Sequence, residues 1–245
     1  MKKYRYKANE VEIDNTLSLS TLNDEVKWEF PSELVNSVRY LVTRLIYKSK
    51  LPPRLALVSP LRQEGVTYIS QVLSAVIAHD LRATVCLVEL NWWWPDKKLA
   101  SLNNGEGLAS VLNQSRQLED VYILTKQSKV TILPSGKMPP QDRPIWARSS
   151  RLKEIIDQLS DQFDHLIFDV PAILATNDAI PLASLSDSCC VVINQGVTSF
   201  ENARLALDEI SHLSVSGVIM NKSHVKTPSW LLKFVPQDMG PVETV

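Results

Sequence analysis

Residues 54–77 read RLALVSPLRQEGVTYISQVLSAVI: an apolar run of strand length, a polar loop, and then a run whose apolar residues recur at helical spacing. A short continuous apolar run is typical of a buried strand, whereas apolar residues three and four positions apart share one face of a helix. The stretch therefore predicts a strand, a tight polar loop, and a helix that carries Thr67 in its first turn.

The same alternation continues through most of the chain. Further apolar runs of strand length occupy residues 83–90, 130–136, 165–171, 189–196 and 215–221. Helical patterns occupy residues 32–48, 107–113, 150–162, 178–186 and 199–213, with Ser32 and Ser199 as expected N-caps. Strands that are apolar throughout and alternate with amphipathic helices are typical of a parallel sheet covered on both faces. We predict an α/β fold, doubly wound, with a mostly parallel sheet and helices on both faces.

The composition fits one globular domain with short tails. The 245 residues carry a formal net charge of -1, which argues against nucleic acid as a partner. The 3 cysteines exclude a disulfide framework, and neither a secretory signal nor a membrane-spanning apolar run is visible, which favours the cytoplasm. We predict a polar, loosely ordered arm over residues 1–30, one domain over 31–225 and a tail over 226–245.

The loop after the first apolar run has the outline of a phosphate-binding loop. Backbone N–H groups at a helix start favour an anion, and a hydroxyl at the position of Thr67 can ligate Mg²⁺. The standard pattern, however, has lysine where Val66 stands and further glycine where Gln63 and Glu64 stand, so only Gly65 remains. Taken alone, this loop fits an ordinary strand-to-helix turn better than a phosphate site.

Two later strand ends carry polar residues of interest. Asp169 follows four apolar residues, where a Walker B carboxylate would hold the Mg²⁺ shell, although an aspartate there also forms turns and helix caps. Asn221 ends the last apolar run, where it can contact an adenine edge or simply end a strand. Ligands of such sheets bind beyond the carboxyl ends of the strands, so both residues are candidates.

Four stretches resemble one protein family in order and spacing. They are HLIFDVPAILATNDAIPLASLSD (165–187), TILPSGKMPP (131–140), CLVELNWWWP (86–95) and SELVNSVRYLVTRL (32–45). The chain resembles the cytoplasmic tyrosine kinases of bacterial capsule and exopolysaccharide synthesis, which are P-loop ATPases of the MinD/ParA type. The similarity runs from about residue 30 to residue 225 and is most specific over 130–196.

The resemblance implies a site whose residues depart from the family pattern. By position, Val66 replaces the phosphate-binding lysine, Glu89 and Asn91 replace two aspartates, and Trp93 and Trp94 replace paired arginines. The implied site comprises catalytic Asp169 and Glu89, metal-binding Thr67 and Asp169, and the nucleotide-binding residues Gln63, Glu64, Gly65, Val66, Thr67 and Asn221. We therefore expect ATP or ADP with Mg²⁺ to bind weakly or not at all. Cations that can stand in for the lysine are Arg62, Lys97, Lys98 and Lys222.

Three functions remain open. The first is a catalytically impaired, kinase-like regulatory or interaction subunit in exopolysaccharide or capsule biosynthesis or export, at the inner face of the cell membrane. By resemblance its partner is a membrane polysaccharide co-polymerase or chain-length regulator, and residues 32–46 form a homo-oligomer contact. The second is an active ATP-dependent tyrosine kinase or ATPase with a rearranged site. The third is a nucleotide-free interaction domain.

Three surface features are candidate contacts for a partner. Trp92–Trp94 either pack in part on the core or form an exposed apolar patch. Residues 39–62 hold six basic residues and no acid, which fits a solvated surface or contact with an acidic membrane surface. Residues 230–240, WLLKFVPQDMG, are a further apolar docking candidate.

Overall fold

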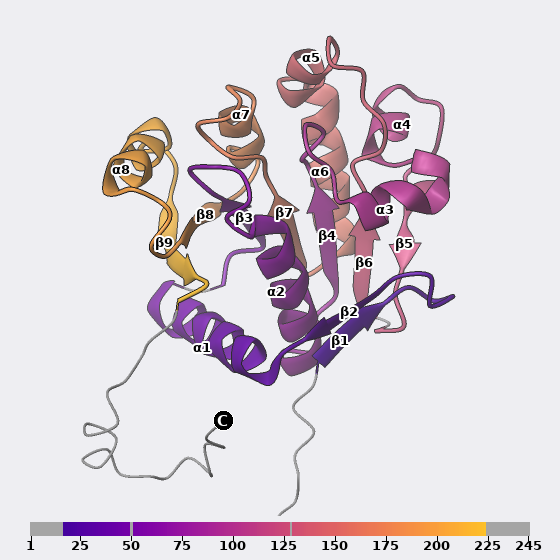
Figure 1. Cartoon of the computed structure of the whole chain (residues 1–245). Helices are drawn as coiled ribbons and strands as arrows, with labels where there is room; N and C mark the ends of the chain where they lie inside the picture. Colours follow the sequence, from indigo (N-terminus) through magenta and orange to yellow (C-terminus); the bar gives the residue numbers. More distant parts are fainter. Residues whose placement is uncertain (1–16, 50, 128, 224–245) are drawn as a thin grey trace, which may run out of the picture.

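The computed structural model describes residues 17–49, 51–127 and 129–223. Its central feature is a seven-stranded sheet with the order β5-β6-β4-β7-β3-β8-β9, and a separate hairpin pairs β1 with β2 (Figure 1). The strands are β1 (Leu17–Ser20), β2 (Lys27–Phe30), β3 (Arg54–Val58), β4 (Val85–Glu89), β5 (Ile123–Leu124), β6 (Val130–Leu133), β7 (His165–Asp169), β8 (Ser188–Asn194) and β9 (Val215–Asn221). All neighbours in the large sheet are parallel except the edge strand β5, so the predicted fold class is confirmed.

Helices cover both faces of this sheet. The α-helices are α1 (Ser32–Ser49), α2 (Val66–Asp80), α3 (Lys97–Ser101), α4 (Leu108–Leu112), α5 (Arg143–Ala147), α6 (Ser150–Gln162), α7 (Ala179–Ala183) and α8 (Phe200–Glu209). Two 3-10 turns are η1 (Leu102–Gly105) and η2 (Glu119–Val121). No helix in the described ranges is long and apolar enough to cross a bilayer.

The core divides into two layers because successive strand residues point to opposite faces. In β3, Ala56 and Val58 pack with α4, α6, α7 and α8, while Leu55 and Leu57 pack with α1, α2 and the hairpin. All four side chains are fully buried, as a strand covered on both faces requires. Cys86 and Cys189 are buried in the first of these layers and Cys190 in the second, and all three are free thiols.

The helix boundaries follow local sequence signals. The hydroxyl of Ser199 accepts a hydrogen bond from the N–H of Asn202, so Ser199 is the N-cap of α8 as predicted. Ser149 caps α6 in the same way, through the N–H of Leu152. Ser32, which was expected to cap α1, is instead its first helical residue, because the N–H of Val35 already bonds to the carbonyl of the preceding proline.

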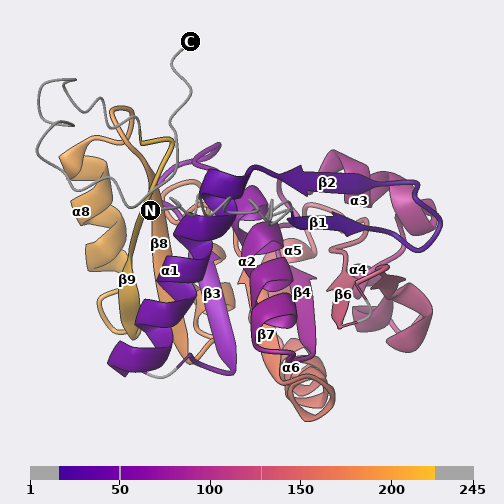
Figure 2. The same ribbon diagram turned by 90° about the horizontal axis from the view of Figure 1, so that it is seen from below.

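The prediction of a loosely ordered arm over residues 1–30 is wrong for residues 17–30. These residues form the β1–β2 hairpin, which lies over α2 and reaches the far edge of the sheet beside β5 and β6 (Figure 2). Leu19, Trp28 and Phe30 from the hairpin are buried in the core layer of α1 and α2. Residues 1–16 lie outside the described residues, as do the whole predicted tail over 226–245 and the apolar stretch within it.

Candidate nucleotide site

The loop that leads from β3 into α2 contains two residues with left-handed backbone conformations. Gln63 has a φ of 64° and Gly65 has a φ of 99°. A Cβ atom on residue 65 would lie 2.1 Å from the side-chain nitrogen of Asn221, so the positive φ favours glycine there and any other residue would also displace the Asn221 amide. The single glycine that this loop retains therefore stands at a position where another residue would be strained.

Glu64 joins this loop to two other parts of the fold. Its buried carboxylate accepts hydrogen bonds from the N–H of Leu61 (3.0 Å) and from the hydroxyl of Thr198, which follows β8. Its main-chain carbonyl accepts a hydrogen bond from the Asn221 amide at 2.8 Å. The loop is thus held by its own carboxylate and by the ends of β8 and β9. Base contact by Asn221 stays a prediction, since its amide here binds the loop.

Asp169 lies at the carboxyl end of β7 and faces the first turn of α2. Its side chain is 2 % exposed, and the Thr67 hydroxyl donates a hydrogen bond to it, but Oδ1 has no hydrogen-bond partner among the described atoms. Burial raises the pKa of Asp169 to about 8, and the nearby Glu89 carboxylate adds to this rise while the Thr67 hydroxyl opposes it. The two predicted metal ligands, Thr67 and Asp169, are therefore adjacent.

Glu89 ends β4 directly beside Asp169 in the sheet register, but its carboxylate is fully occupied elsewhere. It accepts hydrogen bonds from the N–H of Asp96 (2.5 Å) and from both the N–H (2.9 Å) and the hydroxyl (2.7 Å) of Ser135. Burial raises the pKa of Glu89, although these donors oppose the rise. Glu89 does not line the pocket that Asp169 lines, so the structure does not bring the two predicted catalytic carboxylates together there.

A pocket of about 310 Å³ lies over the loop and the end of β7. It is lined by Ser59, Arg62, Gln63, Glu64, Gly65, Val66, Thr67, Tyr68, Asn91, Trp94, Asp169, Val170 and Ala172. The lining includes every predicted site residue except Glu89 and Asn221, and Asn221 contacts the loop from outside. The isopropyl group of Val66 stands where the family pattern expects a lysine, and Val66 is only 8 % exposed.

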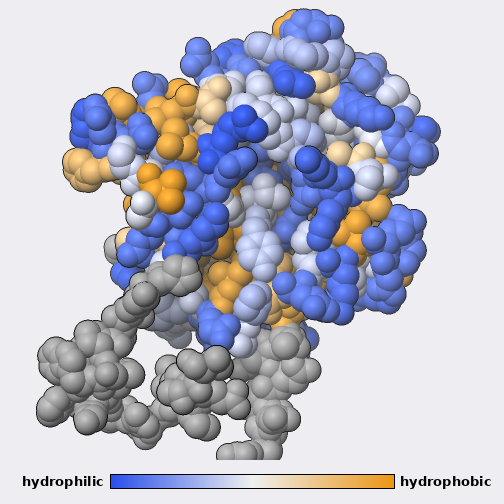
Figure 3. Space-filling model, viewed as in Figure 1, coloured by the Kyte–Doolittle hydropathy of each residue, from blue (hydrophilic) through white to orange (hydrophobic). Residues whose placement is uncertain are grey.

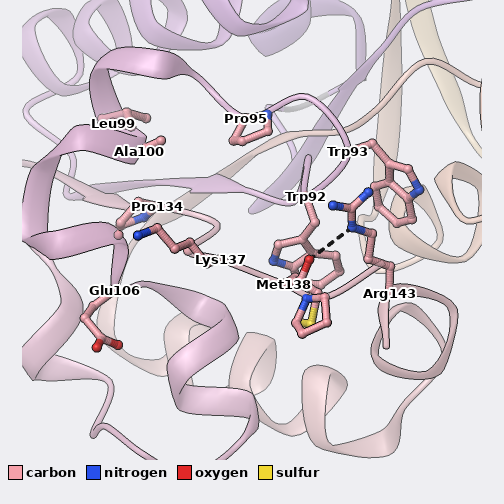
Figure 4. A pocket seen from close by; sticks show the side chains of 13 residues that line it. Trp92, Trp93, Pro95, Leu99, Ala100, Glu106, Pro134, Lys137, Met138 and Arg143 are labelled. Carbon is pink, nitrogen blue, oxygen red and sulfur yellow. Dashed lines mark hydrogen bonds between the residues drawn. The ribbon is translucent and has the colours of Figure 1, made fainter. Parts of the chain in front are cut away.

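The three consecutive tryptophans take different positions. Trp92 is buried, and its indole N–H donates a hydrogen bond to the carbonyl of Ser135 at 2.9 Å. Trp94 lines the pocket above the loop, where the Arg62 guanidinium carbon lies 4.1 Å from the centroid of its ring. Trp93 lines a different pocket, together with Trp92 (Figure 4). The three tryptophans therefore do not form one exposed patch. On the face of the molecule that Figure 3 shows, apolar residues lie in separate patches.

Trp93 forms a wall of a second pocket of about 450 Å³. This pocket lies between residues 90–96, which we call the tryptophan loop, and the loop after β6. The Arg143 guanidinium carbon lies 5.8 Å from the centroid of the Trp93 ring, and Arg143 Nε donates to the carbonyl of Met138 at 3.3 Å (Figure 4). Lys137 lies at the opposite end of this pocket (Figure 4). Sequence reasoning missed this pocket and the role of Ser135, because both depend on contacts between distant loops.

The candidate replacement cations are dispersed. Lys98 lies 5.9 Å from the ring centroid of Trp28 on the hairpin, and Lys222 lines a groove between α1 and β9. Lys97 is exposed at the start of α3. Arg62 differs from these three lysines because it lines the pocket over the β3–α2 loop.

The basic residues of 39–62 and the predicted oligomer helix belong largely to the domain surface. Arg39 forms an ion pair with Asp80 (2.9 Å), and Arg54 forms one with Asp157 (2.7 Å). On α1, which contains the predicted contact region 32–46, Tyr40 is 65 % exposed. Self-association through this helix stays a prediction.

Two curated relatives carry the name tyrosine-protein kinase. The tyrosine-protein kinase ptk of Acinetobacter johnsonii is 27 % identical over 165 residues, which cover 66 % of this chain and 22 % of that protein. The tyrosine-protein kinase YwqD of Bacillus subtilis (strain 168) is 32 % identical over 122 residues, which cover 49 % of this chain and 51 % of that protein. The match thus spans about half, or less, of each relative's length. No protein-family model matches the chain.

Solved structures of a bacterial tyrosine kinase and of a MinD protein have the same fold as this chain. The kinase domain of the Escherichia coli tyrosine kinase ETK superposes with a TM-score of 0.69 at 20 % identity, covering 79 % of each chain. The septum site-determining protein MinD of Pyrococcus horikoshii OT3, complexed with Mg-ADP, superposes with a TM-score of 0.56 at 21 % identity, covering 75 % of this chain and 77 % of that chain. The resemblance seen in the sequence motifs is confirmed. This chain is a homologue of the bacterial tyrosine kinases, with the mostly parallel α/β fold that their kinase domains share with MinD-type P-loop ATPases.

Proposed function

We propose that the chain is a kinase-like P-loop protein with impaired catalysis that acts as a regulatory or interaction subunit. The observation that carries this proposal is Val66, a buried apolar side chain that lines the pocket where the family pattern expects the phosphate-binding lysine. Phosphoryl transfer depends almost wholly on positioning and on stabilising charge around the γ-phosphate. One charge-assisted hydrogen bond contributes about 1.5–3 kcal/mol, and about 1.4 kcal/mol corresponds to a tenfold change in rate.

The second acidic position supports the same conclusion. Glu89 is bound to Asp96 and Ser135, so it cannot turn toward the pocket without breaking three hydrogen bonds. Asn91, which does line the pocket, carries no charge. Asp169 is then the one carboxylate near the loop that is free to position a metal among the residues that the structure describes.

Weak binding of a nucleotide with Mg²⁺ remains compatible with the residues present. Asp169 Oδ1 is a buried oxygen with no partner in the described structure, and the Thr67 hydroxyl is its neighbour. Mg²⁺ is commonly bound through one or two carboxylates together with substrate phosphates, so this pair fits it. A bound ion would supply charge neutralisation for the phosphates. No cluster of three or more His, Cys, Asp and Glu side chains suited to a metal occurs in the described ranges.

We place this function in exopolysaccharide or capsule biosynthesis or export, on the strength of the motif resemblance and of the kinase relatives. The proposed partner is a membrane polysaccharide co-polymerase or chain-length regulator, and the proposed location is the inner face of the cell membrane. Two observations test the setting: whether a neighbouring gene encodes such a membrane protein, and whether that protein co-purifies with this chain. Absence of any such neighbour and of any such complex would contradict it.

The second candidate is an active ATP-dependent tyrosine kinase or ATPase with a rearranged site. The position of Arg62 in the pocket favours it, because this side chain brings a positive charge to a loop that has lost its lysine. The third candidate, a nucleotide-free interaction domain, is favoured by the internal contacts of Glu64, which already use one N–H of the loop.

Calorimetric titration with Mg-ADP and Mg-ATP, together with a turnover assay, separates the three. The proposal predicts saturable nucleotide binding and the same background turnover for wild type and Asp169→Ala. Turnover that disappears in Asp169→Ala, while Arg143→Ala retains it, supports the active enzyme instead. If the chain melts cooperatively but shows no saturable binding at millimolar nucleotide, the result supports the nucleotide-free interaction domain.

A further inference from the structure

The pocket over the β3–α2 loop has valine at position 66, where the family pattern has lysine, but it has an arginine at position 62. Val66 brings no charge, and among the described residues that line the pocket Arg62 is the one with a positive side chain. Arg62 belongs to the loop itself, three residues before Gly65, so its backbone is already placed where a phosphate would approach the N-terminus of α2.

The Arg62 side chain is positioned by an aromatic contact. Its guanidinium carbon lies 4.1 Å from the centroid of the Trp94 ring, within the range of a cation–π interaction. The loop that carries Trp94 is itself held, because the main-chain N–H of Trp94 donates to Asn91 Oδ1 at 3.1 Å and the N–H of Asp96 donates to Glu89. A long, flexible arginine is thus held near the mouth of the pocket at a reduced cost in side-chain entropy.

The charge of Arg62 is available to a ligand. The ion pairs of the described residues do not include Arg62. The nearest loop carboxylate, Glu64, is buried and bound to Leu61 and Thr198 rather than to Arg62. A guanidinium that keeps its planar face on an aromatic ring still presents N–H donors at its edge, and these donors suit phosphate oxygens.

We propose that Arg62, positioned by Trp94, replaces the missing lysine as the phosphate-contacting group of this pocket, which takes the diphosphate portion of a nucleoside di- or triphosphate. This inference rests on the proposed nucleotide binding. It gives the substitutions at positions 66 and 94 a common explanation: the cation has moved within the loop, and the tryptophan that replaced a family arginine now supports it.

The test compares matched arginines on neighbouring tryptophans. Mg-ADP, Mg-pyrophosphate and adenosine are each titrated into wild type, Arg62→Ala, Arg62→Lys, Trp94→Ala and Arg143→Ala. Arg143 is the control, because it contacts Trp93 in the adjacent pocket. We expect Arg62→Ala to weaken Mg-ADP binding about tenfold or more, Arg62→Lys to retain part of the affinity, and Arg143→Ala to bind as wild type.

Pyrophosphate and adenosine separate the parts of the ligand. Arg62→Ala is expected to weaken pyrophosphate by the same factor as Mg-ADP and to leave adenosine unchanged. Trp94→Ala is expected to weaken Mg-ADP binding less than Arg62→Ala does. A double variant with Arg62→Ala and Trp94→Ala should bind Mg-ADP no more weakly than Arg62→Ala alone. If wild type binds Mg-ADP and Arg62→Ala binds equally or more tightly, the inference is wrong and nucleotide binding stands. If folded wild type binds no Mg-ADP, the nucleotide function itself fails, and the inference with it.

Discussion

The carboxylate of Glu89 binds both the main-chain N–H and the hydroxyl of Ser135, although 46 residues separate the two. This pair ties the end of β4 to the loop after β6, and the N–H of Asp96 adds the tryptophan loop to the same carboxylate. The acidic residue at the end of β4 therefore organises the loops around the site, instead of facing the pocket.

We expect Glu89→Ala to lower the free energy of unfolding by about 2–5 kcal/mol, because it leaves buried donors of Ser135 and Asp96 unsatisfied. Urea denaturation followed by circular dichroism measures the change. Replacement of the exposed Glu119 by alanine is the control and is expected to have little effect. Equal midpoints for wild type and Glu89→Ala would show that these hydrogen bonds contribute nothing to stability.

A second prediction concerns the close approach of Gly65 and Asn221. Gly65→Ala is expected to destabilise the fold by about 1–3 kcal/mol, because it adds a Cβ against the Asn221 amide at a positive φ. Asn221→Ala removes that obstacle together with one hydrogen bond, so the double variant should lose less stability than the two single losses combined. Additive losses in this double-mutant cycle would mean that the steric contact has no energetic weight.

The raised pKa of Asp169 predicts a dependence of stability on pH. Because burial raises this pKa from 3.8 to about 8, the folded state favours the protonated carboxyl. That contribution is full below the unfolded-state pKa and is lost as pH rises toward 8. Asp169→Asn keeps a neutral side chain at every pH, so its melting temperature relative to wild type should rise between pH 5 and pH 9. A constant difference across this range would contradict the assignment.

Restoring the lysine tests the role of position 66 directly. Val66→Lys should strengthen Mg-ADP binding about tenfold or more, because it returns a charge-assisted hydrogen bond to the loop. Val66→Leu is the matched control for added volume without charge, and calorimetry measures both. If the two variants bind Mg-ADP alike, the absence of the lysine is not what weakens the site.

A further prediction concerns self-association through the contact region 32–46. Tyr40→Glu on the exposed side of α1 should dissociate a homo-oligomer that uses this helix, because it would bury an unpaired charge in the interface. Light scattering after size-exclusion chromatography measures the mass of each variant. Ile145→Glu, at an equally exposed apolar residue on α5, is the control and should leave the mass unchanged. A wild-type chain that runs as a monomer would refute the prediction.

Local patterns predicted most of the large sheet and its helices. The amphipathic spacing of residues 150–162 gives α6 residue for residue, and its apolar face is buried as the period requires. The hairpin was missed because β1 and β2 have four residues each, which is too short for alternation to stand out among polar neighbours. Such strands are fixed by what they pack on, and a single sequence does not display those contacts.

The site was predictable where it depends on strand ends alone. Asp169 ends β7, and the loop that leads to Thr67 follows the neighbouring parallel strand β3, so their proximity follows from topology. The orientation of Glu89 was not predictable, because it depends on Ser135 from another loop. The contact between Arg62 and Trp94 likewise joins two loops with no common local pattern.

The hairpin also has a consequence for the order in which the chain can fold. Its turn residue Asp24 forms an ion pair with Lys126, 102 positions later, and Ser20 donates its N–H to the side chain of Gln127. A ribosome that makes the chain from its N-terminus must therefore complete β5 before the hairpin can close over it. Contacts between such distant residues form slowly. Once closed, the hairpin covers the edge strand β5, where the N–H of Leu22 bonds to the carbonyl of Leu124, and it protects that edge of the sheet against pairing with other chains.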